Sequence, residues 1–324
     1  MFNIIIILLS LAGLSSYSLN NHFSFINHKK IEYGIYSYKP EDYKLSGITT
    51  DHYFSVWGKQ YKKKNLGHIE KFNDSYNYED QDSKTNDKKI SKKALLTLEP
   101  WPMLGEKLNR DLLLNNIANG KYKSIIQDFC SDVEANSNKD IFVRWGHEME
   151  LFETSRYMWA SKDSELFVRA YKTWVDTCRM FTKKIKYTWS PAGNKGQENY
   201  YPGDSYVDNI GFGWYSYPAY EWYSYKKILT FNEIISEKYN RVKIYNKPLI
   251  IAEFGIAGNK KEKTTMIDSI TNYKRNTGKT LEETFPLITD IIIFAEDKTE
   301  SWLENIIEAP EWALTTEEIE KINK

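Results

Sequence analysis

The chain has 324 residues, which is enough for one large α/β domain or two smaller ones, and 41% of them are hydrophobic. Lysine plus arginine and aspartate plus glutamate each number 44, so the formal net charge is zero. A neutral chain has no global attraction for nucleic acid or for anionic membranes, and we expect neither as a partner.

Residues 1–16 carry an apolar stretch of roughly 11 residues followed by small ones, which is short for a membrane span and typical of a secretory signal. We therefore expect residues 1–18 to be a signal peptide and residues 19–324 to form a single domain of a secreted or periplasmic protein. Because no Lys or Arg precedes the apolar stretch, an uncleaved N-terminal anchor remains the alternative.

The first elements expected after this segment are two strands, at residues 32–37 and 51–57. Residues 62–93 are dominated by Lys, Asn, Asp and Ser with almost no apolar periodicity, which predicts a long lysine- and asparagine-rich surface loop. An apolar strand at residues 94–101 follows and ends in a carboxylate, a proline and Trp101.

Strand and helix patterns then alternate along the chain. Further strands are expected at 141–143, 185–191, 206–215, from 249 and from 291, and helices at 122–133, 166–178 and near 225–239. About eight strands separated by helices predict an α/β fold of the (β/α)8 TIM barrel type. A doubly wound open sheet is the alternative, but no G-x-G-x-x-G or P-loop follows any strand.

The two cysteines, Cys130 and Cys178, lie on expected helices on either side of the strand at 141–143. In an exported protein they could form a disulfide, and two buried free thiols are the alternative. The chain has five histidines, none in an H-x-H or H-E-x-x-H arrangement, and no C-x-x-C pair. We therefore expect no metal and no cofactor.

Two apolar strands end in a single glutamate each. One runs from Ile141 to His147 and Glu148, and the other runs from Pro248 to Glu253 before a glycine. Because the carboxyl ends of barrel strands form one face, these two glutamates should meet there. Further polar and aromatic residues at strand ends are expected on the same face, namely Trp57, Glu99, Trp101, Arg144, Trp189, Tyr215 and Glu296.

A carboxylate pair flanked by tryptophans, without a metal cluster, suits glycoside hydrolysis, in which one carboxyl protonates the leaving oxygen and the other attacks the sugar or activates water. Aromatic faces also suit the apolar faces of pyranose rings. The structural alternative is that Glu148 and Glu253 merely pair with buried arginines, and that the tryptophans close the barrel mouth.

The chain resembles glycoside hydrolase family 26, which holds β-mannanases and related β-glucanases and xylanases. The resemblance covers roughly residues 32–305 and is carried by four segments and one residue, Arg144–Met149, Trp159, Tyr187–Pro191, Tyr201–Asp208 and Lys247–Gly255. It implies a retaining endo-β-glycoside hydrolase that acts on β-mannan or β-glucan. Nothing in the sequence such as a heptad run argues for assembly, so we expect a monomer.

The resemblance also implies roles for single residues. Glu148 corresponds to the acid/base and Glu253 to the nucleophile, with His147 beside the acid and Tyr215 orienting the nucleophile. Substrate binding is implied for five residues, of which the first two would be subsite walls: Trp101, Trp189, Trp159, His147 and Tyr215.

One position departs from the resemblance. The family commonly continues His-Glu-Met with Asn, whereas this chain has Glu150. A non-catalytic polysaccharide-binding or exopolysaccharide-assembly protein on the same barrel is the alternative function. The presence of both Glu148 and Glu253 favours the enzyme, because a binding protein needs no acid and nucleophile.

Overall fold

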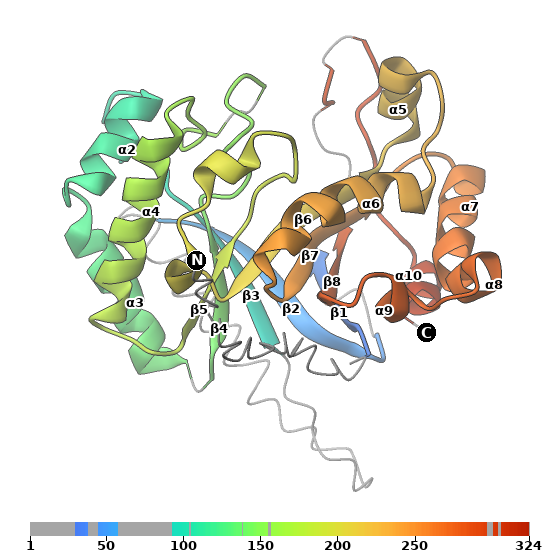
Figure 1. Cartoon of the computed structure of the whole chain (residues 1–324), viewed down its shortest axis with the longest axis horizontal. Coiled ribbons are helices and arrows are strands. Elements are labelled where there is room, and N and C mark those ends of the chain that lie inside the picture. The colour runs from blue at the N-terminus through green and yellow to red at the C-terminus, as the bar shows by residue number, and fades with distance from the viewer. Residues whose placement is uncertain are drawn as a thin grey trace, which may run out of the picture.

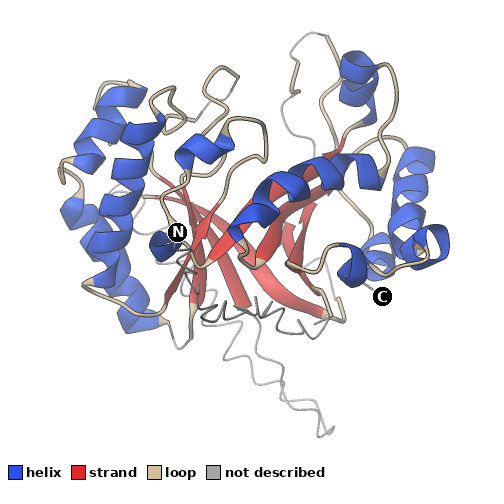
Figure 2. Cartoon of the chain, viewed as in Figure 1, coloured by secondary structure: helices blue, strands red, loops and turns tan. Residues whose placement is uncertain are grey.

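Eight parallel strands, paired in sequence order and closed by β8 against β1, form a barrel at the centre of the molecule (Figures 1 and 2). Their bounds are β1 Glu32–Ser37, β2 Ile48–Val56, β3 Lys93–Glu99, β4 Ile141–Trp145, β5 Ile185–Trp189, β6 Asn209–Ser216, β7 Leu249–Ile256 and β8 Ile288–Ala295. The predicted (β/α)8 barrel is confirmed.

The computed structural model describes residues 30–37, 45–57, 93–103, 105–137, 139–154, 157–296, 301–303 and 306–323. The expected signal peptide and nearly all of the expected loop at 62–93 lie outside these residues. Lys93, the last residue of that loop, is instead the first residue of β3.

The helices cover the barrel in two groups (Figure 1). The first group is α2 Arg110–Ala118, α3 Lys123–Asn136 and α4 Ser164–Arg179. The second is α5 Pro218–Tyr225, α6 Phe231–Val242, α7 Lys260–Thr271, α8 Tyr273–Thr277, α9 Leu281–Thr284 and α10 Thr316–Ile322. None of the described helices combines the length and the apolar character that crossing a membrane requires.

Alternation along the strands divides the core into two layers. Inside the barrel, Leu95, Phe142, Ile250, Ala252 and Ile292 form a small cluster from strands that face one another. The opposite faces of the strands pack against the helices, as Trp145 does against α4. Because the barrel is filled with side chains, chemistry is confined to its carboxyl end.

The helices α3 and α4 are joined by a disulfide between Cys130 and Cys178, whose Cα atoms lie 5.3 Å apart. Both cysteines are fully buried. The sequence allowed either a disulfide or two free thiols, and the structure contains the disulfide.

Replacing both cysteines by alanine should lower the free energy of unfolding by about 2–4 kcal/mol, because the bond closes a loop in the unfolded chain. Urea denaturation of the wild type and the Cys130→Ala/Cys178→Ala variant, with and without a reducing agent, measures this. Reduction should destabilise only the wild type. Equal midpoints for the two oxidised proteins would contradict the prediction.

Candidate active site

The two glutamates predicted as a pair lie at the carboxyl end of the barrel and act electrostatically on each other. Glu253 lies on β7, and Glu148 follows β4 by three residues. Gly213, on β6, connects them in space: it pairs with Glu253 across the sheet, and a Cβ atom on it would lie 3.6 Å from Glu148 Oε1.

The segment after β4 turns sharply to bring Glu148 over the barrel mouth. Gly146 and Glu148 have φ values of 57° and 54°, the left-handed region that a non-glycine residue rarely adopts. The turn is fixed by backbone bonds, in which Gly146 N–H donates to Leu98 O at 3.2 Å and Glu148 N–H to Ser190 O at 2.8 Å. A strained backbone at Glu148, held by neighbouring strands, is typical of a functional position.

A bulge in β7 directs Glu253 into the barrel. Ile250 and Ala252 point inward with the interior cluster, so regular alternation would place Glu253 on the outer face. The pairing of β6 with β7 shifts register here: Phe212 pairs with Ile251 and Gly213 with Glu253. The extra residue turns Glu253 inward, as bulges beside active sites often do.

Glu253 is held as a carboxylate by two donors. Arg144 Nη1 donates to Oε1 and forms an ion pair with it, and the Tyr215 hydroxyl donates to Oε2. Arg144 is fully buried and Glu253 is 7% exposed. A buried carboxylate needs this compensation, because burial alone would favour its neutral form.

Arg144 is itself held by its neighbours inside the barrel. Its Nε donates to Ser190 Oγ at 2.6 Å and its Nη1 contacts Thr97 Oγ1 at 3.5 Å. Thr97 Oγ1 also lies 2.8 Å from His52 Nε2. These contacts connect β2, β3 and β5 to the ion pair.

The Tyr215 ring packs against β6 and β7 at two glycines. A Cβ atom on Gly255 would lie 2.6 Å from Tyr215 Cδ1, and one on Gly213 would lie 3.0 Å from its Cε2. Any larger side chain at either position would push the ring away. The predicted role of Tyr215 in orienting Glu253 therefore has a geometric basis, namely the bond from its hydroxyl.

Glu148 has the opposite environment to Glu253. Burial of its carboxyl group raises its pKa to about 7, and the charge of Glu253 acts in the same direction, while Arg144 and Lys238 oppose it. Glu148 is therefore protonated up to about neutral pH. Two neighbouring carboxyls in such different surroundings are the usual sign of an acid and a base or nucleophile.

His147, which precedes Glu148 in the chain, forms an aromatic group with Trp159 and Tyr157. Trp159 Nε1 donates to His147 O at 2.6 Å, and the Trp159 ring stacks on Tyr157 at 4.6 Å. The ring centroids of Trp101 and Trp159 lie 5.5 Å apart in an edge-to-face arrangement, and Trp101 is partly exposed. Of this group, Trp101 keeps the surface that a subsite wall needs.

Three of the predicted substrate contacts do not fit the structure. Trp189 is fully buried and packs outside the barrel against Tyr201 and Tyr245. Its strand alternates so that Ser190, the next residue, points inward to Arg144. Trp159 and His147 are also fully buried. None of these three rings offers a face to a sugar, so the wall role of Trp189 and direct contact by Trp159 and His147 are corrected to structural support.

Three residues of this region were not predicted from the sequence. Ser190 holds Arg144, Lys238 on α6 reaches Gly213 O at 2.6 Å, and Trp302 lies edge-on to Tyr215 at 5.5 Å. Trp302 had a detectable signal, because it is an aromatic residue just after the last strand. Trp57, which was expected on the face, is 2% exposed and supports Trp101 by donating to its carbonyl at 2.6 Å.

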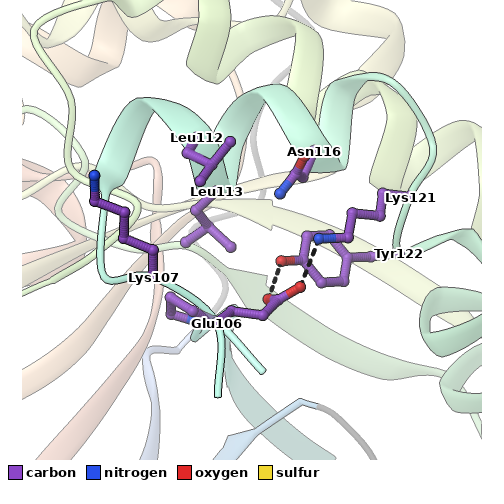
Figure 3. A pocket seen from close by; sticks show the side chains of 8 residues that line it. Glu106, Lys107, Leu112, Leu113, Asn116, Lys121 and Tyr122 are labelled. Atoms are coloured by element: carbon purple, nitrogen blue, oxygen red, sulfur yellow. Dashed lines mark hydrogen bonds and ion pairs between the residues drawn. The ribbon is translucent and has the colours of Figure 1, made fainter. Parts of the chain in front are cut away.

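A pocket of about 200 Å³ lies away from these carboxyls, between α2 and the segment after β3. Figure 3 shows its carboxylate, Glu106, bound to Lys121 and Tyr122. The Lys121 contact measures 2.6 Å, and Met103 N–H donates to Glu106 as well. Since its charge is already neutralised within the protein, this pocket does not compete with the barrel mouth as the candidate site.

A closed parallel barrel that carries a buried carboxylate and a proton-holding carboxyl at its carboxyl end defines a class, the barrel-fold glycoside hydrolases. The sequence model of Glycosyl hydrolase family 26 matches residues 105–276, more than half of the chain. The protein therefore belongs to glycosyl hydrolase family 26.

Individual relatives are more distant. Over 186 residues the chain is 28% identical to endoglucanase H of Acetivibrio thermocellus. The aligned region covers 51% of this chain but only 19% of that protein. Among solved structures, GH26C from Muricauda sp. superposes with a TM-score of 0.59 at 13% identity, covering 92% of this chain and 86% of the other. A GH26 β-mannanase from Bacteroides ovatus gives 0.54 at 12% identity, with coverages of 92% and 88%. At these identities the structural likeness shows the fold.

Replacing Arg144 by methionine should lower the free energy of unfolding by about 3–5 kcal/mol at pH 7.5, because Glu253 would be left as an unpaired buried charge. The loss should be smaller at pH 4.5, where the unpaired Glu253 can take up a proton. Urea denaturation at both pH values measures it.

Lys186→Met is the matched control, since its ion pair with Asp140 is exposed on both sides. That variant should lose less than about 1 kcal/mol at either pH. An Arg144→Met variant as stable as this control would show that the buried pair does not hold the barrel mouth together.

Proposed function

We propose that this protein is a retaining endo-β-glycoside hydrolase that cuts a β-linked polysaccharide by double displacement. The proposal rests on one observation, the different surroundings of two neighbouring carboxyls. Glu253 is fixed as an anion by Arg144 and Tyr215, whereas Glu148 holds a proton up to about pH 7. One group is prepared to attack and the other to donate.

In the first step, a Glu253 oxygen attacks the anomeric carbon and forms a glycosyl ester. The bond from that carbon to the leaving oxygen breaks, and Glu148 gives its proton to this oxygen. Arg144 and Tyr215 orient the carboxylate before the attack, because both of its oxygens are bound.

In the second step, Glu148 works as a base. Once Glu253 is an ester its negative charge is gone, and with it one cause of the raised pKa of Glu148. Glu148 is then a carboxylate that takes a proton from water, the water oxygen attacks the anomeric carbon, and Glu253 is released. The product keeps the configuration of the substrate.

We propose β-mannan as the first substrate to test and mixed-linkage or other β-glucan as the second. Support for mannan comes from the family and from fold neighbours that are β-mannanases. Support for glucan comes from the partial match to an endoglucanase. Purified protein incubated with each polymer, with the product anomer followed by NMR, tests both the reaction and its stereochemistry. Binding without turnover on every polymer would favour the non-catalytic alternative.

We further propose that the protein works outside the cytoplasm as a monomer. The disulfide between Cys130 and Cys178 supports export, because such bonds persist in oxidising compartments, and the apolar segment at residues 1–16 is the matching signal. All of the residues proposed to act in catalysis come from a single chain.

Glu253→Gln should reduce kcat by roughly 10⁴-fold or more while oligosaccharide binding remains measurable by calorimetry, because the amide keeps the shape but cannot attack. Glu165→Gln, at an exposed carboxylate in the first turn of α4, is the control and should keep normal activity. Turnover at the wild-type rate by Glu253→Gln would rule out this residue as the nucleophile.

Trp302→Ala should lower kcat/KM on long substrates by about tenfold, because an aromatic face beside Tyr215 can stack on a sugar ring. Trp302 is 44% exposed. Trp222→Ala, which removes a tryptophan 60% exposed on α5, is the matched control. Kinetics on oligosaccharides of increasing length measure the difference, and equal losses in the two variants would contradict a subsite at Trp302.

A further inference from the structure

Lys238 is a lysine whose ammonium group is buried. Its helix, α6, covers β6, and its Nζ donates to Gly213 O at 2.6 Å. Its stem packs on Gly193, where a Cβ atom would lie 3.0 Å from Lys238 Cγ. Part of the side chain remains exposed, but the ammonium group is enclosed, and this burial lowers its pKa against the opposing effect of nearby carboxyls. A lysine usually keeps its ammonium in water, so this position calls for a function.

The carboxyls that act on this ammonium are Glu148, Glu150 and Glu253 from the site and Glu237 from its own helix. Its bonding partner, Gly213, is also the residue that lies beside Glu148 Oε1 and pairs with Glu253. The cation therefore approaches the acid from the outer side of β6, across one strand.

Glu150 is the second charge behind the acid. It is 9% exposed, and its Oε1 accepts from Gly193 N–H at 3.0 Å and Asn194 N–H at 3.3 Å. Its Oε2 is buried and has no hydrogen-bond partner among the described residues. The backbone donors favour the carboxylate, and burial opposes them and raises the pKa of Glu150. Gly193 thus contacts both side chains, Glu150 through its N–H and Lys238 through its Cα.

The groups that face Glu148 come from every side of the mouth. Glu253 and Glu150 disfavour its anion, and Arg144 and Lys238 favour it. Tyr215, between β6 and β7, is kept as a neutral phenol because burial and the two carboxylates raise its pKa well above its usual value. Arg144 already pairs with Glu253. Among the described residues, Lys238 is the other cation that acts on Glu148, and Glu148 is the charge that acts most on Lys238.

We propose that Lys238 and Glu150 are positioning residues of opposite charge that tune the proton donor Glu148, Lys238 by stabilising its carboxylate and Glu150 by stabilising its protonated form. The inference rests on the proposed function, because it assigns Glu148 as the acid/base. Neither residue touches substrate, and each acts through the strand and turn that carry Glu148.

The test uses the pH dependence of kcat/KM, whose basic limb reports the acid of the free enzyme. Lys238→Met removes the cation at nearly constant length and should move the basic limb up by about half to one pH unit. Glu150→Gln keeps an acceptor for Gly193 and Asn194 and should move the limb down by a similar amount. The double variant should return close to the wild type.

A readout that needs no substrate separates this inference from the proposed function. Proteins labelled with ¹³C at the glutamate side-chain carboxyl are titrated by NMR, and Glu148→Gln assigns the signal. The same opposite shifts should appear in the Glu148 midpoint. Lys243→Met, an exposed lysine just beyond α6, is the control and should leave the midpoint unchanged.

Opposite shifts in the NMR midpoints support the inference even if no polymer tested is cut, whereas midpoints that stay at the wild-type value or move in the same direction overturn it. An active enzyme with unshifted limbs overturns it as well, without affecting the proposed hydrolysis. If Lys238→Met does not fold, the downward shift in Glu150→Gln decides the result alone.

Discussion

The buried ion pair between Arg144 and Glu253 is the interaction on which the rest of the site depends. Removing two charges from water costs several kcal/mol each, and only good geometry and further hydrogen bonds offset that cost. The chain supplies them through Thr97 and Ser190 on Arg144 and through Tyr215 on Glu253. These residues come from or follow β3, β5 and β6, so the strands around the mouth must close correctly for the pair to form.

This arrangement also separates the two carboxyls. The guanidinium of Arg144 and the phenol of Tyr215 both donate to Glu253, so each oxygen of this carboxylate has a partner. Glu148 faces that negative charge from a strained turn, with its carboxyl enclosed, and it therefore keeps its proton. The alternative stated from the sequence, a structural ion pair, is thus part of the proposed mechanism rather than its rival.

The sequence predicted the barrel and the meeting of Glu148 and Glu253, because apolar strands ending in a carboxylate follow a simple rule about the face of a barrel. It could not predict the bulge in β7, since the register shift depends on pairing with β6 and leaves no pattern in the residues. It also placed Trp189 wrongly. A tryptophan at a strand end can face either way, and here Ser190 takes the inward position to hold Arg144.

The buried position of Lys238 could not be predicted from the sequence for a similar reason. On an amphipathic helix a lysine normally belongs to the solvated face. The missing side chain of Gly193 makes room for the stem of this one, so that its ammonium reaches the carbonyl of Gly213 on the strand beneath. Glu150 stood out in the sequence as a charge in place of an amide, yet its surroundings could not be read there. The proposed roles of Lys238 and Glu150 depend on each other, because each residue contacts Gly193 and each acts on Glu148.

Glu148 and the four charged groups that act most on it have a balance that fits a two-step reaction. With Glu148 protonated and Glu150 as the carboxylate that accepts from Gly193 and Asn194, the cations Arg144 and Lys238 are matched by Glu253 and Glu150. In the proposed glycosyl intermediate, Glu253 is a neutral ester and Glu148 has become the second anion. The total charge is unchanged, and a negative charge has only moved from β7 to the turn after β4. In a poorly solvated site such a transfer avoids creating an uncompensated charge at either stage. By the same balance, an asparagine at position 150 would leave one cation in excess beside Glu148.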